Sequence, residues 1–444
     1  MTSAAEAGPG RRVVGLEHLV DGLGAEMASW CELTAVHQAP LEKHRSQIRS
    51  VAAMVTESLA AARAQLATGG GADLPVLILD LHHVWDYFRS KFALRRLPEY
   101  RGYLDAADEL AWACYRGPLT AALDAGTATT KEPPLVSFSR DLTPRAHRRG
   151  GQYRDLLPRG GIHSRTGVEL VRSLPFPVID VPWFYGSHLP AVLTVAHEVG
   201  HHIEDDFDLT AEIGARLAGT ALPGAWAGEV FADVCASLAC GVAYPAVLAD
   251  VIAMLNPDAG TEPAAPEREL SPHPPLDVRL RVCLAVLDAA GHPRPTTRPA
   301  PIAEALPEDR PDRSHDASEV AAALLGDGYP SLSGRRLPDL LSSPPAQQVH
   351  ADRLLAGLTS GLARPAGVFS AAALAFLADP AEYRARRVGS RAINEALTLR
   401  PEGPRARGSV GTGDAGTARD TDAGNQLLRA LRERPGYRDR DRPE

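Results

Sequence analysis

The chain has 444 residues, with 47 Lys and Arg against 55 Asp and Glu and a formal net charge of −8. This length is enough for a large core and about three domain-sized units. The acidic balance argues against a nucleic-acid-binding protein, which normally carries a basic stripe. We therefore expect a peptide or protein partner and no nucleic acid.

The composition also bears on the compartment. The chain has no run of about 18 apolar residues, and its N-terminus lacks a charged head followed by an apolar stretch, so we expect no membrane association and a cytoplasmic location. The cysteines are odd in number and lie mostly in apolar helical patterns, which favours reduced core residues over disulfides. They are Cys31, Cys114, Cys235, Cys240 and Cys283.

Apolar residues recur mostly at helical spacing in the N-terminal third of the chain. Over the whole sequence the pattern predicts a mainly α fold with a small β-sheet. We expect a disordered leader over residues 1–12 and an N-terminal helical region over 13–130. Its predicted helices cover 40–68, 74–93 and 104–123.

After residue 133 the pattern changes to the alternation that is typical of strands. Residues 135–139 and 176–181 are the two predicted strands. Pro177 and Pro182 flank the second one, and because proline cannot donate to a strand ladder we expect this strand at a sheet edge. An edge strand can pair with an extended peptide, although a proline-flanked edge is equally a device against aggregation.

The most informative stretch is 194–202, which reads TVAHEVGHH and contains an HExxH motif. On a helix, residues i and i+4 point the same way, so His197 and His201 can hold one ion between them. Zinc binds imidazole nitrogen readily, and Glu198 stands beside the first ligand, where its carboxylate can take a proton from a metal-activated water. The motif therefore indicates metal-dependent hydrolysis with Glu198 as general base.

A second motif follows on the next predicted long helix. HExxH arises by chance in roughly one such chain in thirty, so a further signal is required. Glu229 and Asp233 share one helix face at i, i+4 spacing. A catalytic zinc takes three protein ligands, and a ligating histidine usually gives its other N–H to a carboxylate. We expect Glu229 to be the third ligand and Asp233 to be that carboxylate.

A third motif, His273-Pro-Pro followed by Arg279, forms a predicted rigid turn that leads into a helix ending at Gly291. Polar groups on such a fixed corner are suited to stabilise developing charge. Either His273 or Arg279 can donate to the oxyanion that forms during peptide hydrolysis, because donors act best when they are held in place beforehand.

The remaining chain carries no motif to which we attach chemistry. Residues 292–330 are rich in proline and charge and are a predicted linker. A C-terminal helical region is expected over 331–400, and a disordered tail over 401–444. The pattern gives no signal for the oligomeric state or for the cleavage preference.

HExxH followed by ExxxD resembles the gluzincin metallopeptidases, the thermolysin-like superfamily, over about residues 175–290. The HPP…R element is similar to one in the CAAX-type and heat-shock membrane peptidases. The resemblance implies a zincin-like catalytic domain over 131–291, flanked by helical regions, which binds one zinc ion and cleaves peptide bonds. By this resemblance the zinc ligands are His197, His201 and Glu229, the general base is Glu198, and the orienting carboxylate is Asp233.

The chain departs from these families in two ways. The membrane peptidases have long apolar spans, which this sequence lacks. The second motif is also similar to that of small soluble peptidases that cut phage-type repressors, but those usually have asparagine where this chain has Asp233.

The same residues bear on other classes of metal-binding protein. A metzincin needs glycine at 204 and histidine at 207, where the chain has Glu204 and Phe207. A di-iron bundle needs a second ExxH helix, and closed structural zinc sites often use cysteines, none of which lies near the histidines in sequence. A catalytically silent zincin-like scaffold that binds a peptide or protein partner stays open, although an intact Glu198 favours activity.

Overall fold

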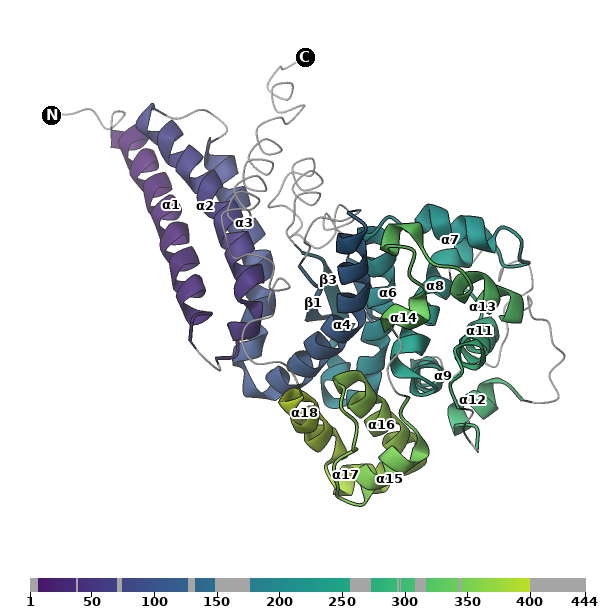
Figure 1. Ribbon diagram of the computed structural model, residues 1–444. Helices are drawn as coiled ribbons and strands as arrows, with labels where there is room; N and C mark the ends of the chain where they lie inside the picture. The colour runs from purple at the N-terminus through teal and green to yellow at the C-terminus, as the bar shows by residue number, and fades with distance from the viewer. Residues whose placement is uncertain are drawn as a thin grey trace, which may run out of the picture. The chain divides into compact units, whose positions relative to one another are not determined.

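The predicted fold class is confirmed, since the chain is mainly helical with a small mixed sheet (Figure 1). It divides into two compact units, one drawn from residues 1–98 and 147–176, the other from 99–146 and 177–401. The computed structural model describes residues 7–36, 39–69, 74–126, 132–147, 176–255, 273–293, 295, 297–307, 317–341 and 345–399.

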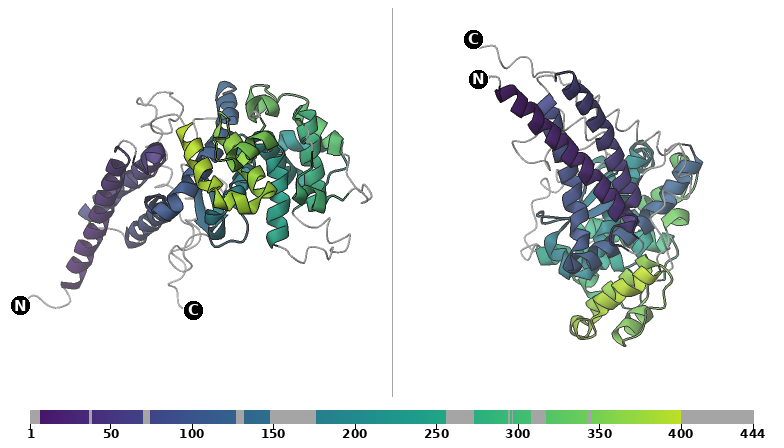
Figure 2. Two further views of the ribbon diagram at one scale, coloured as in Figure 1. Left: turned by 90° about the horizontal axis from the view of Figure 1, so that it is seen from below. Right: turned by 90° about the vertical axis from the view of Figure 1, so that its left-hand side faces the viewer.

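The first unit consists of three long helices that pack against one another, and two views show α1 and α2 side by side along their length (Figure 2). An apolar stripe on α2 is fully buried, as the helical spacing predicts. The rings of Trp30 and Trp85 meet edge to face, with centroids 5.4 Å apart. The elements are α1 (Ala7–Leu33), η1 (Glu42–His44), α2 (Arg45–Ala67), α3 (Leu74–Ala93) and η2 (Leu94–Arg96).

The first helix begins earlier than the sequence pattern indicates. We expected a disordered leader over 1–12, but α1 starts at Ala7. Pro9 falls in the first turn of the helix, where a missing backbone N–H costs no intrahelical hydrogen bond. The glycines and proline at this end are therefore compatible with a helix start, and only residues 1–6 of the predicted leader lie outside the described part of the chain.

The second unit contains the sheet, with strand order β1-β3-β2 and β1 parallel to β3. The pairing register sets Leu135 opposite Val178 and Phe138 opposite Val181. All of β3 is buried, and so is β1 except at its last residue. The strands are β1 (Leu135–Ser139), β2 (Arg145–His147, in this unit to Ala146) and β3 (Val178–Pro182).

The expectation that the second strand lies at a sheet edge is wrong, because β3 is the middle strand. Pro177 precedes the strand and its carbonyl accepts a hydrogen bond from the backbone N–H of Leu135 at 2.9 Å, while Pro182 is the last residue. A proline at a strand end removes no ladder hydrogen bond, so this position is as acceptable as an edge. Since both sides of β3 are paired, it cannot receive an added substrate strand.

In the second unit, α6 (Thr194–Asp206) packs against α8 (Ala227–Cys240), and α8 also contacts α11 (Leu276–Ala289). No helix in the described ranges has the length and apolarity that a membrane span requires. The other helices are α4 (Pro98–Asp124, in this unit from Glu99), α7 (Thr210–Leu217), α9 (Ala243–Leu255), α12 (Ala300–Ala305), α13 (Ala317–Leu325), α14 (Leu337–Leu341), α15 (Gln348–Leu355), α16 (Pro365–Ala378), α17 (Pro380–Ala385) and α18 (Val388–Thr398). The 3₁₀ turns are η4 (Trp183–Ser187), η5 (Leu189–Leu193), η6 (Gly224–Trp226) and η7 (Pro330–Leu332).

The segment predicted as a linker, 292–330, contains two helices that pack into the second unit. The helix α12 contacts α9, and α13 contacts α11. Pro301 lies in the first turn of α12, where proline favours a helix start, and Val320 and Leu324 of α13 are fully buried. A proline in this segment therefore marks the start of a helix, α12, where the sequence pattern predicted only a linker. The predicted tail, 401–444, lies outside the described residues.

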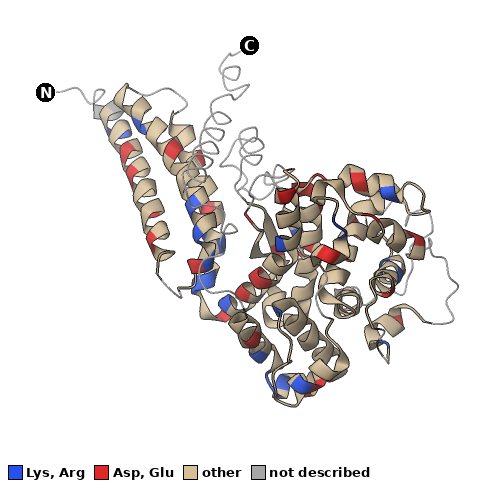
Figure 3. Ribbon diagram, in the orientation of Figure 1, with Lys and Arg blue, Asp and Glu red and all other residues tan. Residues whose placement is uncertain are grey.

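Charged residues are mixed along the helices of the described chain, with acidic and basic positions often on the same helix (Figure 3).

All five cysteines are free thiols, and four of them are buried, as the apolar patterns around them indicate.

Candidate metal centre

The two histidines of the HExxH motif lie on α6, a helix that is buried over almost its whole length. Val195 and Val199 are fully buried, and His197 and Glu198 are 8 % and 7 % exposed. The helix follows η5, which has Pro190 in its first turn. A helix that is apolar on the face away from its histidines fixes their position and keeps the surroundings dry.

Gly200, inside the motif, allows α6 and α8 to meet closely. A Cβ atom at this position would lie 2.6 Å from the Cα and 3.1 Å from the backbone oxygen of Ala232 on α8. Cβ atoms do not approach backbone so closely, so only glycine fits here without a shift of one helix. The contact brings the first turn of α8, with Glu229, to the histidines of α6.

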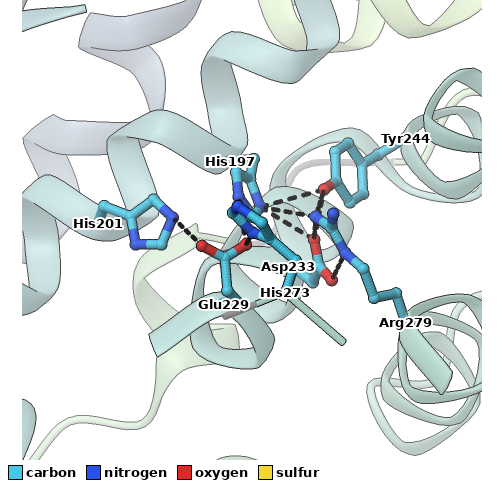
Figure 4. Close-up of polar contacts among 7 residues, drawn as sticks. All are labelled: His197, His201, Glu229, Asp233, Tyr244, His273 and Arg279. Atoms are coloured by element: carbon cyan, nitrogen blue, oxygen red, sulfur yellow. Dashed lines mark hydrogen bonds and ion pairs between the residues drawn. The ribbon is translucent and has the colours of Figure 1, made fainter. Parts of the chain in front are cut away.

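The structure brings together the three predicted ligands, His197, His201 and Glu229, whose donor atoms all lie within 4.8 Å of one another. His197 Nε2 is 3.4 Å from Glu229 Oε2, and His201 Nε2 is 3.4 Å from Glu229 Oε1. Figure 4 shows the Glu229 carboxylate between the imidazole of His201 on one side and that of His197 on the other. Side chains from two helices, α6 and α8, thus converge on one point.

These spacings fit a zinc ion. Zinc bonds of about 2.0–2.2 Å in a tetrahedron set neighbouring donor atoms about 3.4 Å apart. The distances from His197 Nε2 to Glu229 Oε2 and from His201 Nε2 to Glu229 Oε1 both have this value. Two imidazoles and one carboxylate are also the donor set that catalytic zinc sites use when one position is kept for water or substrate. The group could therefore hold a metal ion.

Asp233 orients the first of these histidines. Asp233 Oδ1 lies 2.9 Å from His197 Nδ1 and the aspartate is fully buried. When Nδ1 carries the proton that this bond needs, the lone pair of Nε2 points to Glu229 and the metal position. For His201, Nδ1 is buried and has no hydrogen-bond partner among the described residues. The chain thus fixes the tautomer of His197 more firmly than that of His201.

Arg279 holds Asp233 from the other side. Its Nε donates to Asp233 Oδ2 at 2.7 Å and its Nη2 donates to Oδ1 at 2.6 Å, in a buried two-bond pair. Tyr244 also donates its hydroxyl to Asp233 Oδ1, at 2.5 Å. Nε and Nη2 of Arg279 therefore face Asp233, and in this structure they support that carboxylate.

Tyr244 is a residue that the sequence reasoning missed. It lies near the start of α9, it is fully buried, and its hydroxyl is 3.2 Å from His197 Nδ1 as well as bonded to Asp233. Nothing in the surrounding apolar run distinguishes this tyrosine from an ordinary core aromatic residue. Only the packing of α9 against α6 and α8 brings the hydroxyl to the site.

His273 lies at the rim of the site, in the turn before α11. Its side chain is 64 % exposed, and its Nδ1 is 3.2 Å from Glu229 Oε2. The hydrogen bond to Glu229 raises the pKa of His273 above its ordinary value. The histidine therefore faces both solvent and the Glu229 carboxylate.

Glu198 has no hydrogen-bond partner among the described residues, although it is 7 % exposed. The charge of Glu198 acts on Tyr185 in η4. Burial raises the pKa of this tyrosine, and the negative charge of Glu198 raises it further. The Tyr185 hydroxyl is itself buried and has no partner in the described chain. A carboxylate that neighbouring donors do not occupy is available to accept a proton.

The positions that would define a metzincin serve other purposes. Glu204 accepts a hydrogen bond from the Thr210 hydroxyl at 2.9 Å, and Phe207 is buried in the core.

Among the described residues, His197, His201 and Glu229 form the one group of three or more acidic, histidine or cysteine side chains spaced to hold a metal. A di-iron site would need a second such group.

Opposite charges dominate the electrostatics of the site. Burial alone would raise the pKa of Asp233, but the charge and hydrogen bonds of Arg279 hold it well below its usual range. The pKa of Glu229 is likewise held far below its usual range, because the hydrogen bonds of His197, His201 and His273 outweigh its burial. Both carboxylates are therefore charged at neutral pH.

We expect zinc affinity to rise with pH. Burial lowers the pKa of His197, but the hydrogen bonds of Asp233 and Glu229 outweigh it and raise the pKa to about 9 in the metal-free protein. Zinc must displace this proton, so the dissociation constant should fall about tenfold per pH unit from pH 7 to 8 and level off near pH 9. Competition with a coloured chelator at each pH measures it, and a flat profile from pH 7 to 8 would contradict a protonated His197.

The same titration predicts the stability of the metal-free protein. The His197 pKa is raised above its unfolded value of about 6.5, so its charge stabilises the fold fully below that pH. The contribution is lost as the pH rises through about 9. Melting temperatures of the metal-free protein should therefore decrease over this window, and zinc-loaded protein should not show the decrease.

Replacing Arg279 with methionine is expected to lower the free energy of unfolding by about 3–5 kcal/mol, because it leaves the charge of the fully buried Asp233 without its counterion. Urea denaturation monitored by circular dichroism measures the change. The control is Arg386→Met, which removes an exposed ion pair with Glu382 on α17 and should cost about 0.3–0.5 kcal/mol. Equal effects of the two substitutions would show that the buried pair is not a structural support.

No known protein family, curated protein or solved structure matches this chain. Any inference about its activity therefore depends on the residues and geometry of the site.

Proposed function

We propose that this chain is a zinc-dependent metallopeptidase that hydrolyses peptide bonds with Glu198 as general base. The observation that supports the proposal is the convergence of His197, His201 and Glu229 at the spacing of zinc ligands. The buried contact between His197 and Asp233 adds to it, because hydrolytic zinc sites commonly orient a ligand histidine in this way.

Bound zinc would supply an electrophile that polarises a peptide carbonyl and makes water more acidic. Glu198 follows His197 in the chain and has no hydrogen-bond partner among the described residues, so its carboxylate can accept a proton from the attacking water. The same carboxyl group can then return the proton to the leaving amine nitrogen. These two transfers are the general acid and base steps that peptide hydrolysis requires.

Three other side chains support these steps. Asp233 keeps His197 in the tautomer whose Nε2 can bind metal, and Arg279 keeps Asp233 charged and in place. His273 at the exposed rim can donate to the carbonyl oxygen as negative charge develops there. We propose a peptide or protein as substrate and, in view of the free cysteines, the reducing cytoplasm as the compartment.

The test measures metal content and cleavage on the same purified protein. We expect about one zinc per chain by elemental mass spectrometry, cleavage of a peptide mixture, loss of cleavage with a chelator, and its return with added zinc. Protein that binds no zinc would refute the proposal. Zinc-loaded protein that binds peptides without cleaving any would instead indicate a catalytically silent zincin-like scaffold.

A further inference from the structure

His273 is held near the metal position by its neighbours in the chain. Pro274 and Pro275 follow it directly, and their rings restrict the backbone. One turn into α11, Arg279 is bonded twice to the buried Asp233. The backbone of His273 is therefore anchored to α8, while its side chain is 64 % exposed.

Glu229 Oε2 has two nitrogen atoms at nearly the same distance. His197 Nε2 lies at 3.4 Å and His273 Nδ1 lies at 3.2 Å. Both distances are near the value of about 3.4 Å that separates neighbouring ligands of one tetrahedral zinc ion. In the conformation seen, His273 lies beside the group formed by His197, His201 and Glu229 and outside it, in contact with Glu229 (Figure 4).

We propose that His273 is a fourth zinc ligand in the peptide-free protein and that a substrate carbonyl displaces it. This inference rests on the proposed function. Four protein ligands make a closed site, whereas three leave the open position that hydrolysis needs. An imidazole tethered at the rim competes with water at a high effective concentration. The site would therefore be latent until substrate arrives, and the displaced ring would stay close to the carbonyl oxygen.

The exposure of His273 explains why the exchange can be reversible. A buried fourth ligand would leave a cavity or an unsatisfied ring on leaving the metal. The imidazole of His273 moves into water instead, because most of its side chain is already exposed. A ligand that competes with His273 for the metal binds only to molecules in which the ring is displaced. Its apparent dissociation constant is therefore the intrinsic value divided by the fraction of such molecules.

The first experiment is zinc X-ray absorption spectroscopy of the full-length zinc-loaded protein without peptide. We expect three imidazole ligands in the wild type and two in His273→Ala. His18→Ala removes an exposed histidine from α1 and should keep three. The second experiment titrates acetohydroxamate, a small chelating zinc ligand, and should show at least about tenfold tighter binding to His273→Ala than to the wild type.

The outcomes separate this inference from the proposed function. Two imidazoles in the zinc-loaded wild type would overturn the role of His273 and leave the zinc peptidase proposal standing. Equal hydroxamate affinity of the wild type and His273→Ala would also overturn it. Absence of zinc from both proteins would refute both proposals. Since the wild-type spectrum alone counts the imidazoles, the test does not depend on the folding of the variant.

Discussion

Glu198→Gln is expected to keep zinc bound and to lose about 10²–10⁴-fold in kcat/KM for peptide hydrolysis, the usual contribution of a general base. Glutamine has the shape of glutamate but cannot accept the proton of the attacking water. Glu198 has no hydrogen-bond partner among the described residues, so the substitution should not disturb α6. The measurement compares zinc per chain and kcat/KM in the wild type and the variant.

A matched control lies six residues further along the same helix. Glu204 is also buried on α6, and its Oε1 accepts a hydrogen bond from Thr210, which a glutamine oxygen can also accept. Glu204→Gln should therefore retain zinc and activity. If Glu198→Gln remained as active as this control, the proton would have to be accepted by another group, and Glu198 would not be the base.

Glu229→Ala is expected to remove stoichiometric zinc. Changes to residues that only orient a ligand already reduce metal affinity about 10–100-fold, so loss of a ligand should cost more than about 100-fold. The substitution also removes the carboxylate that His197, His201 and His273 all face. The measurement is zinc per chain after dialysis, followed by competition titration against a chelator of known affinity.

The control for this experiment is Glu304→Ala, which removes an exposed carboxylate from α12. It should bind as much zinc as the wild type. Equal zinc content in the wild type and in Glu229→Ala would exclude Glu229 as a ligand. The metal centre would then consist of the two α6 histidines with a donor that the sequence does not indicate.

Local spacing predicted four of the residues that converge at the site, His197, His201, Glu229 and Asp233. His197 and His201 share a face because of helix geometry, and the same holds for Glu229 and Asp233 on α8. The strand at 135–139 and the helix at 74–93 were also predicted with the bounds that the structure has. These features depend on residues close together in the chain.

Features that depend on packing between distant segments were not predictable. The sequence does not indicate that the Tyr244 hydroxyl donates a hydrogen bond to Asp233, or that Arg279 donates to the same carboxylate. The middle position of β3 depends on which strands come to lie beside it, and proline at a strand end is compatible with either place. Helix contacts fix these choices, and single-residue patterns do not encode them.

The backbone contact at Gly200 implies how the protein should respond to metal. Because α6 and α8 meet so closely at Gly200 that a Cβ atom would not fit, their packing itself holds the donors at the spacing that an ion requires. Binding should therefore have a small heat-capacity change, and amide hydrogens in the middle of both helices should exchange at similar rates with and without zinc under native conditions. This behaviour would differ from that of zinc fingers, whose folding and metal uptake are one event.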